Sequence, residues 1–195
     1  VYLRTLHELH LRHGLSRAVI VVPSVAIREG VLQQIRATRE HFAELFGGQR
    51  IVESLFDPSK LSDLQRFARD PGLQVLVLNM DSFNKGWANL IHRPADGLKG
   101  RRPSELIAGA SPVVILDEPQ NLEGPSTRTA VEELQACITL RYSATHRRRP
   151  NLLYRLDPVR AYDLRLVKRI EVIGVTPEGD DQVLVDVLEV KGHRT

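Results

Sequence analysis

The chain has 195 residues and a single cysteine, Cys137. One cysteine excludes a framework of intramolecular disulfides, and this usage is typical of a reducing cytosol. The seven histidines are scattered and form no cluster with the cysteine, so the pattern predicts no zinc site. Because Cys137 follows an amphipathic segment, we expect it to be a small core residue at the end of a helix.

Long hydrophobic runs are also absent. No stretch is long enough for a transmembrane helix, and no basic-then-apolar signal segment opens the chain. Aromatic residues make up only 5% of the sequence, but 42% hydrophobic and 26% charged residues are ordinary for a globular protein. The length allows one good-sized domain and a small appendage.

No charge of one sign dominates, since the formal net charge is only +3. This balance permits binding to nucleic acid without requiring it. Two basic clusters stand out, at residues 99–102 and 147–149. Such clusters are usually solvated loops. The second is equally consistent with a contact to phosphate, because it follows a predicted strand directly.

Apolar runs alternate with amphipathic segments, which predicts an α/β fold with a mostly parallel sheet and helices on both faces. The expected strands are 17–22, 50–55, 74–79, 113–117 and 138–142. The expected helices are 1–13, 24–45, 59–70, a short one at 80–85, 127–137, and 151–163 with an interruption at Pro158. Residues 87–109 are expected to form a mobile loop or insertion, and residues 166–174 and 182–190 a β-hairpin.

The right-handed crossover rule places every strand-to-helix loop of such a fold on one edge of the sheet. Four polar segments fall on that edge: Pro23-Ser24, Asn79–Asp81, Asp117–Gln120 and Ser143–His146. The pattern therefore predicts a shared functional face.

The most informative segment is the run 113–120, in which four apolar residues end in Asp117 and Glu118. A continuous apolar run is typical of a strand buried on both faces of a parallel sheet. Two acids at its end are costly to desolvate without a compensating partner. A nucleotide-driven motor needs such acids, one for Mg²⁺ and one for the attacking water. The alternative is a strand that ends in a solvated acidic turn.

A second strand, 138–142, is followed by Ser143, Ala144 and Thr145. The hydroxyl groups at this strand end can hydrogen-bond across to the acidic loop and sense whether a phosphate is present. Taken alone, the same three residues would indicate only a turn of small residues.

Together the two segments resemble motifs II and III of superfamily 2 helicases and translocases. A closer resemblance is to the Res subunit of type III restriction–modification enzymes. It rests on residues 20–31, 117–120, 142–146 and 151–159, and extends from Val1 to about residue 172. The resemblance implies a RecA-like P-loop NTPase sandwich, with a partial first motor domain at 1–166 and a hairpin connector or the start of the next domain at 167–195.

The resemblance implies an ATP-dependent hydrolase of the bacterial cytoplasm that uses ATP and Mg²⁺. Asp117 is then expected to hold Mg²⁺ through water, and Glu118 to orient or deprotonate the hydrolytic water. Gln120 is expected to contact the nucleotide region or a second motor domain. The residues implied to couple hydrolysis to domain movement are Ser143, Thr145 and His146. For His146, a histidine that only occupies a turn is an equal alternative.

The implied partners are double-stranded DNA and a modification methyltransferase subunit. Backbone contacts of this kind position a motor on DNA without reading sequence. The residues matched to DNA-contacting motifs are Pro23, Ser24 and Arg28, with Ser82, Asn84 and Lys85 in a second, weaker group. For Ser24, the alternative is a plain helix cap.

The chain departs from the family in one respect, because the loop Gly-x-x-x-x-Gly-Lys-Ser/Thr that cradles phosphates is absent. In the family this loop would precede the helix that starts at Val1, and the only methionine is Met80. We therefore expect a fragment that is inactive alone, from an active parent. The alternatives are a non-catalytic RecA-like nucleic-acid-binding module and another superfamily 2 DNA or RNA helicase.

Overall fold

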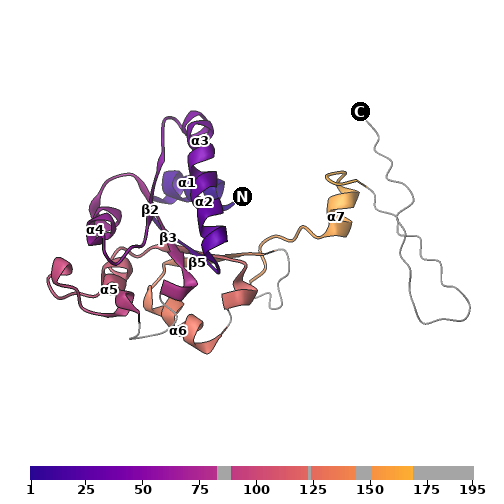
Figure 1. Ribbon diagram of the computed structural model, residues 1–195. Coiled ribbons are helices and arrows are strands. Elements are labelled where there is room, and N and C mark those ends of the chain that lie inside the picture. Colours follow the sequence, from indigo (N-terminus) through magenta and orange to yellow (C-terminus); the bar gives the residue numbers. More distant parts are fainter. Residues whose placement is uncertain (83–88, 123, 144–150, 169–195) are drawn as a thin grey trace, which may run out of the picture. The chain divides into compact units, whose positions relative to one another are not determined.

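The structure is a computed structural model that describes residues 1–82, 89–122, 124–143 and 151–168 (Figure 1). Its contacts divide the chain into two units, Val1–Arg147 and Arg148–Thr195. The domain boundary expected at residue 166 stays a prediction. No helix among the described residues is both long and apolar enough to cross a membrane.

The first unit is built on a five-stranded sheet with the order β2-β3-β1-β4-β5. Every neighbouring pair is parallel. The strands are β1 (Arg17–Val22), β2 (Ile51–Leu55), β3 (Leu73–Asn79), β4 (Val113–Asp117) and β5 (Ile138–Tyr142). All five agree with the sequence-based prediction within one residue at either end.

Helices cover both faces of this sheet (Figure 1). One face carries α1 (Tyr2–His13), α2 (Val25–Ala37) and α3 (Arg39–Leu45). The other carries α4 (Leu61–Arg69), α5 (Pro103–Ala108) and α6 (Pro125–Glu133). Alternate residues of β1 point to opposite layers, with Val19 and Val21 in one core and Ile20 and Val22 in the other. The predicted α/β class, a RecA-like three-layer sandwich, is confirmed.

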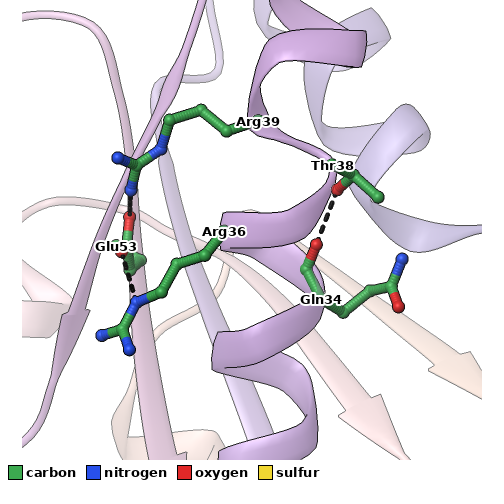
Figure 2. A network of polar contacts seen from close by, with 5 residues as sticks. All are labelled: Gln34, Arg36, Thr38, Arg39 and Glu53. Carbon is green, nitrogen blue, oxygen red and sulfur yellow. Dashed lines mark hydrogen bonds and ion pairs between the residues drawn. The ribbon is translucent and has the colours of Figure 1, made fainter.

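The helix predicted at 24–45 is in fact two helices. Ser24 caps the start of α2, since its Oγ accepts a hydrogen bond from the backbone N–H of Ile27 at 3.3 Å. The break falls at Thr38, whose hydroxyl donates to the backbone carbonyl of Gln34 at 2.7 Å (Figure 2). A threonine side chain that bonds back in this way bends a helix, so the prediction of one continuous helix was wrong.

On either side of the break, two arginines hold a partly buried acid on the edge strand β2 (Figure 2). Arg36 Nε lies 3.1 Å from Glu53 Oε1, and Arg39 Nη2 lies 2.6 Å from Glu53 Oε2. The Glu53 side chain is only 10% exposed. This arginine–glutamate cluster ties the α2–α3 junction to the sheet and places charge on an edge that could otherwise pair with another strand.

The segment between β3 and β4 is more ordered than the loop expected at 87–109. After the 3₁₀ helix Met80–Ser82, the described part contains 3₁₀ helices Leu90–His92 and Asp96–Leu98, followed by α5. Ile91, Leu98 and Ile107 are buried in the core beside α4. The expectation was wrong for residues 89–109 because these spaced apolar side chains anchor an otherwise polar segment.

The ends of two helices also differ from expectation. Helix α6 ends at Glu133, so Cys137 lies beyond it and is exposed, with its Sγ donating to the Pro112 carbonyl at 3.5 Å. In the second unit, Pro158 begins α7 (Pro158–Asp163) instead of interrupting a helix. Proline suits the first helical turn, and Asp157 caps it. The predicted hairpin lies almost wholly outside the described residues.

Candidate active site at the carboxyl edge of the sheet

The carboxyl ends of four adjacent strands meet at one edge of the sheet. In the register, Val22 of β1 lies beside Asn79 of β3, and Asp117 of β4 lies beside Tyr142 of β5. Strands β1 and β4 are themselves neighbours. Because all these strands are parallel, the segments that follow them emerge on the same edge, as the crossover rule predicted.

Asp117 is the last residue of β4 and is half-buried. Burial, and then the adjacent charge of Glu118, raise the pKa of its carboxyl group above the ordinary value. Among the described residues, no lysine, arginine or histidine side chain forms an ion pair with it. Asp117 is thus a carboxylate whose ionised form a bound cation would stabilise.

The described residues contain no group of three or more histidines, cysteines or acids that could hold a metal by themselves. A single carboxylate is nevertheless a sufficient protein ligand for Mg²⁺ in nucleotide sites, where water and phosphate oxygens supply the other positions. The donor set at Asp117 therefore fits Mg²⁺ bound together with a nucleotide, and does not fit a dedicated metal cage.

Glu118 has a left-handed backbone conformation, with φ of +52°. The residue before a proline is pushed away from the right-handed helical region, and Pro119 follows. The Glu118 N–H donates to the main-chain carbonyl of Tyr142 at 2.9 Å, which holds this turn against β5. A non-glycine residue in this conformation is uncommon, and such conformations cluster at functional sites.

The turn brings three polar side chains into a closed triangle. Gln120 Nε2 donates to Glu118 Oε2 at 2.5 Å. Ser143 Oγ lies 2.9 Å from Glu118 Oε2 and 2.8 Å from Gln120 Oε1. The serine hydroxyl carries one proton, so these two acceptors compete for it. The structure therefore brings together Glu118, Gln120 and Ser143, which the sequence had placed at the ends of two different strands.

The start of α1 lies at the same edge, which sequence reasoning missed. The Tyr142 hydroxyl donates to Thr5 Oγ1 at 3.1 Å, and the rings of Tyr2 and Tyr142 meet edge-on with centroids 5.6 Å apart. Burial, and then the charge of Asp117, raise the pKa of Tyr2 to about 12. The sequence offered one hint of this contact, an aromatic residue at the end of the strand that pairs with the strand of Asp117. The hint becomes informative only once the strand register places Tyr142 beside Asp117.

The residues matched to the first DNA-contacting motif follow β1 on this edge. Pro23 and Ser24 are partly exposed, and the Ser24 oxygen caps α2. The Arg28 guanidinium donates to Glu29 Oε1 at 3.1 and 2.8 Å. The structure thus shows Ser24 as a helix cap and Arg28 in a local ion pair. A contact of either residue with DNA stays a prediction.

Several predicted site residues lie outside the described residues: Asn84, Lys85, Thr145, His146 and the basic cluster at 147–149. Ser82 ends the 3₁₀ helix after β3, at the carboxyl edge. The roles assigned to all of them stay predictions.

No model of a known protein family matches the chain. The chain is similar to Res subunits of type III restriction–modification enzymes. It is 27% identical to the EcoP15I Res subunit of Escherichia coli, and 27% identical to the EcoPI Res subunit of Escherichia phage P1, over 190 residues in each case. Each of these matches covers 87% of this chain and 19% of the relative.

The StyLTI Res subunit of Salmonella typhimurium is 29% identical over 164 residues, which cover 74% of this chain and 17% of that protein. The chain therefore spans less than a fifth of the length of these relatives. The resemblance recognised from the motifs is confirmed as similarity to a segment of Res subunits.

Proposed function

We propose that this chain is part of the ATP-hydrolysing DNA motor of a type III restriction enzyme. The observation that carries the proposal is the pair Asp117–Glu118 at the carboxyl end of β4, with Glu118 hydrogen-bonded to Gln120 and Ser143. Ligands of open α/β sheets bind beyond the carboxyl ends of the strands. Similarity to Res subunits supports a helicase-like restriction subunit.

In this proposal Asp117 holds Mg²⁺, which would neutralise charge on the phosphates of ATP. Glu118 orients the attacking water and accepts its proton. Burial of Asp117 supports its role, because a half-buried carboxylate next to a second acid gains more from a cation than an exposed one. Gln120 keeps the Glu118 carboxylate oriented through the bond from its amide group.

Ser143 couples the acidic loop to the strand β5. When Glu118 turns toward a water, the Ser143 hydroxyl keeps an acceptor in Gln120 Oε1 at 2.8 Å, so the serine proton stays hydrogen-bonded. The hydrogen bonds of Ser143 therefore change when Glu118 moves, and Ser143 begins the segment that follows β5. Thr145 and His146 in that segment are proposed to pass the change on to domain movement.

The proposed track is double-stranded DNA, held through its backbone by Pro23, Ser24 and Arg28, and by Ser82, Asn84 and Lys85. The loop after β1 supports this placement, since it shares an edge with the acids. The proposed partner is the modification methyltransferase subunit, as in a type III system of the bacterial cytoplasm. Sequence recognition would then belong to that partner, because backbone contacts carry no base information.

The test is DNA-stimulated ATP hydrolysis by the full-length gene product and its Glu118→Gln variant. The substitution keeps the size of the side chain and removes the base, so turnover should fall by about 100-fold or more while ATP binding persists. A matched control is Glu44→Gln, which removes an exposed carboxylate from α3 and should leave turnover unchanged.

Turnover that survives in Glu118→Gln would refute the role of Glu118. A full-length protein that binds DNA and hydrolyses no ATP would instead identify a non-catalytic binding module, and the roles of both acids would be withdrawn. Stimulation by RNA in place of DNA would point to another superfamily 2 helicase.

A further inference from the structure

We propose that Tyr142 is a positioning residue, whose hydroxyl sets the distance between the first turns of α1 and the acidic loop that binds the metal and nucleotide. This inference rests on the proposed function. Tyr142 is suited to the task because it contacts both elements. Its main-chain carbonyl accepts from Glu118 N–H at 2.9 Å, and its side-chain hydroxyl donates to Thr5 Oγ1 at 3.1 Å.

The other contacts of α1 do not hold its end in the same way. Leu3 and Leu6 pack into the apolar core on the face of the sheet. His7 stacks on Phe42 and Phe46, with ring centroids 5.1 and 4.8 Å apart, and its Nδ1 is hydrogen-bonded at 3.1 Å to Gln49, in the segment that follows α3. Apolar packing is non-directional and tolerates small shifts along the helix axis. The hydrogen bond between Tyr142 and Thr5 is directional, and it lies at the edge where the acids are.

The two elements that Tyr142 joins lie beside the same acid. Tyr142 is paired with Asp117 in the strand register, and the Tyr2 ring at the start of α1 meets the Tyr142 ring edge-on with centroids 5.6 Å apart. In the proposed function, Asp117 holds the metal ion that accompanies the nucleotide. The spacing of α1 and the acidic loop therefore sets the room beside Asp117 for the metal-bound nucleotide.

Loss of this bond should change binding more than chemistry. The contact between Tyr142 and Glu118 is made by the main chain of both residues, so Tyr142→Phe preserves it. Tyr142→Phe and Thr5→Val each remove one partner of the side-chain hydrogen bond. Each should raise KM for MgATP about three- to tenfold, as expected for one hydrogen bond, with kcat within about twofold of wild type.

The experiment measures steady-state kinetics of the full-length gene product on DNA, for both single variants and the double variant. The double variant should be no worse than either single variant, since all three lack the same bond. Thr5→Ser keeps the hydroxyl and should keep KM near wild type. Tyr162→Phe removes a phenol hydroxyl from α7 and serves as the matched control. Thermal unfolding shows that each variant is folded.

Three results would overturn the positioning role: an unchanged KM, a fall in kcat without a rise in KM, or additive effects in the double variant. Glu118→Gln separates this inference from the proposed function. If Glu118→Gln abolishes turnover and Tyr142→Phe leaves KM unchanged, only the positioning role fails. If Glu118→Gln retains turnover, the proposed function fails as well.

Discussion

Glu53 and Asp117 are acids on strands of the same parallel sheet, yet their environments shift the pKa in opposite directions. Burial acts to raise the pKa of Glu53, but its own backbone and the guanidinium groups of Arg36 and Arg39 outweigh burial and lower it (Figure 2). Burial also raises the pKa of Asp117, and the charge of Glu118 raises it further.

The comparison separates a structural acid from a candidate functional one. Glu53 has its cations within the chain, so its charge is already compensated in the folded protein. Asp117 is followed by a second acid, an arrangement that costs folding free energy unless a ligand compensates it. Proteins retain such costs at functional sites more often than elsewhere. The carboxyl edge therefore carries an acid that forms no ion pair with a lysine, arginine or histidine of the described residues, whereas Glu53 has two such partners.

The largest expected effect is on turnover, from Asp117→Asn in the full-length gene product. Loss of the proposed metal ligand should lower ATP turnover by about 100-fold or more, because metal stabilisation of the transition state amounts to several kcal/mol. The free energy of unfolding should stay the same or rise, since a repulsion between neighbouring acids is removed. Kinetics and chemical denaturation measure the two effects. A large loss of stability would show that Asp117 is structural, like Glu53.

The second effect is on stability, from Glu53→Gln in the 195-residue chain. Removing the acid leaves two arginines without their partner, but both are partly exposed, so the cost should be about 1–3 kcal/mol. Denaturation at neutral pH measures it. Because the folded pKa of Glu53 is lowered, the ion cluster stabilises the fold above the ordinary carboxyl pKa, and this stabilisation is lost as the pH falls through the lowered value. The difference between variant and wild type should therefore shrink in acid.

A smaller effect should distinguish the two arginines. Arg39 is 38% exposed and makes the shorter contact to Glu53, whereas Arg36 is 62% exposed. Arg39→Ala should cost about 1 kcal/mol and Arg36→Ala about half as much or less, because exposed ion pairs contribute little. If chemical denaturation gave the same loss in free energy of unfolding for both variants, the exposure of the two arginines would not explain their contributions.

The smallest effect should come from His7, a buried histidine that joins α1 to α3. Burial lowers its pKa, the hydrogen bond with Gln49 opposes this, and the charge of His10 adds to the lowering. The folded state therefore binds fewer protons than the unfolded state between the lowered value and the ordinary value of 6.5. The neutral ring stabilises the fold fully above 6.5, and this is lost as the pH falls through the lowered value. Thermal unfolding should show a melting temperature that falls as the pH is lowered below 6.5, and His7→Phe should make this dependence on pH weaker.

The strands β1, β3 and β4 were predictable because burial on both faces leaves an unambiguous apolar pattern. Residues 17–22 and 113–116 are nearly all apolar, and both form central strands of the sheet. The break at Thr38 was not predictable from the sequence. A threonine whose hydroxyl bonds back to the carbonyl of Gln34 and a threonine whose hydroxyl faces solvent can have identical neighbours in the sequence. Burial of Ile91 and Leu98 likewise depends on α4, which lies far away in the sequence.

The candidate site divides in the same way. The sequence by itself determined which residues stand at strand ends, since the apolar run that stops at Asp117 and the segment Ile138–Tyr142, in which apolar and polar residues alternate, are local patterns. Only the tertiary structure decided that Ser143 meets Glu118 and Gln120, that the Glu118 turn is left-handed, and that Tyr142 reaches Thr5. These contacts depend on strand register and helix docking, which arise from packing between segments as much as 137 residues apart.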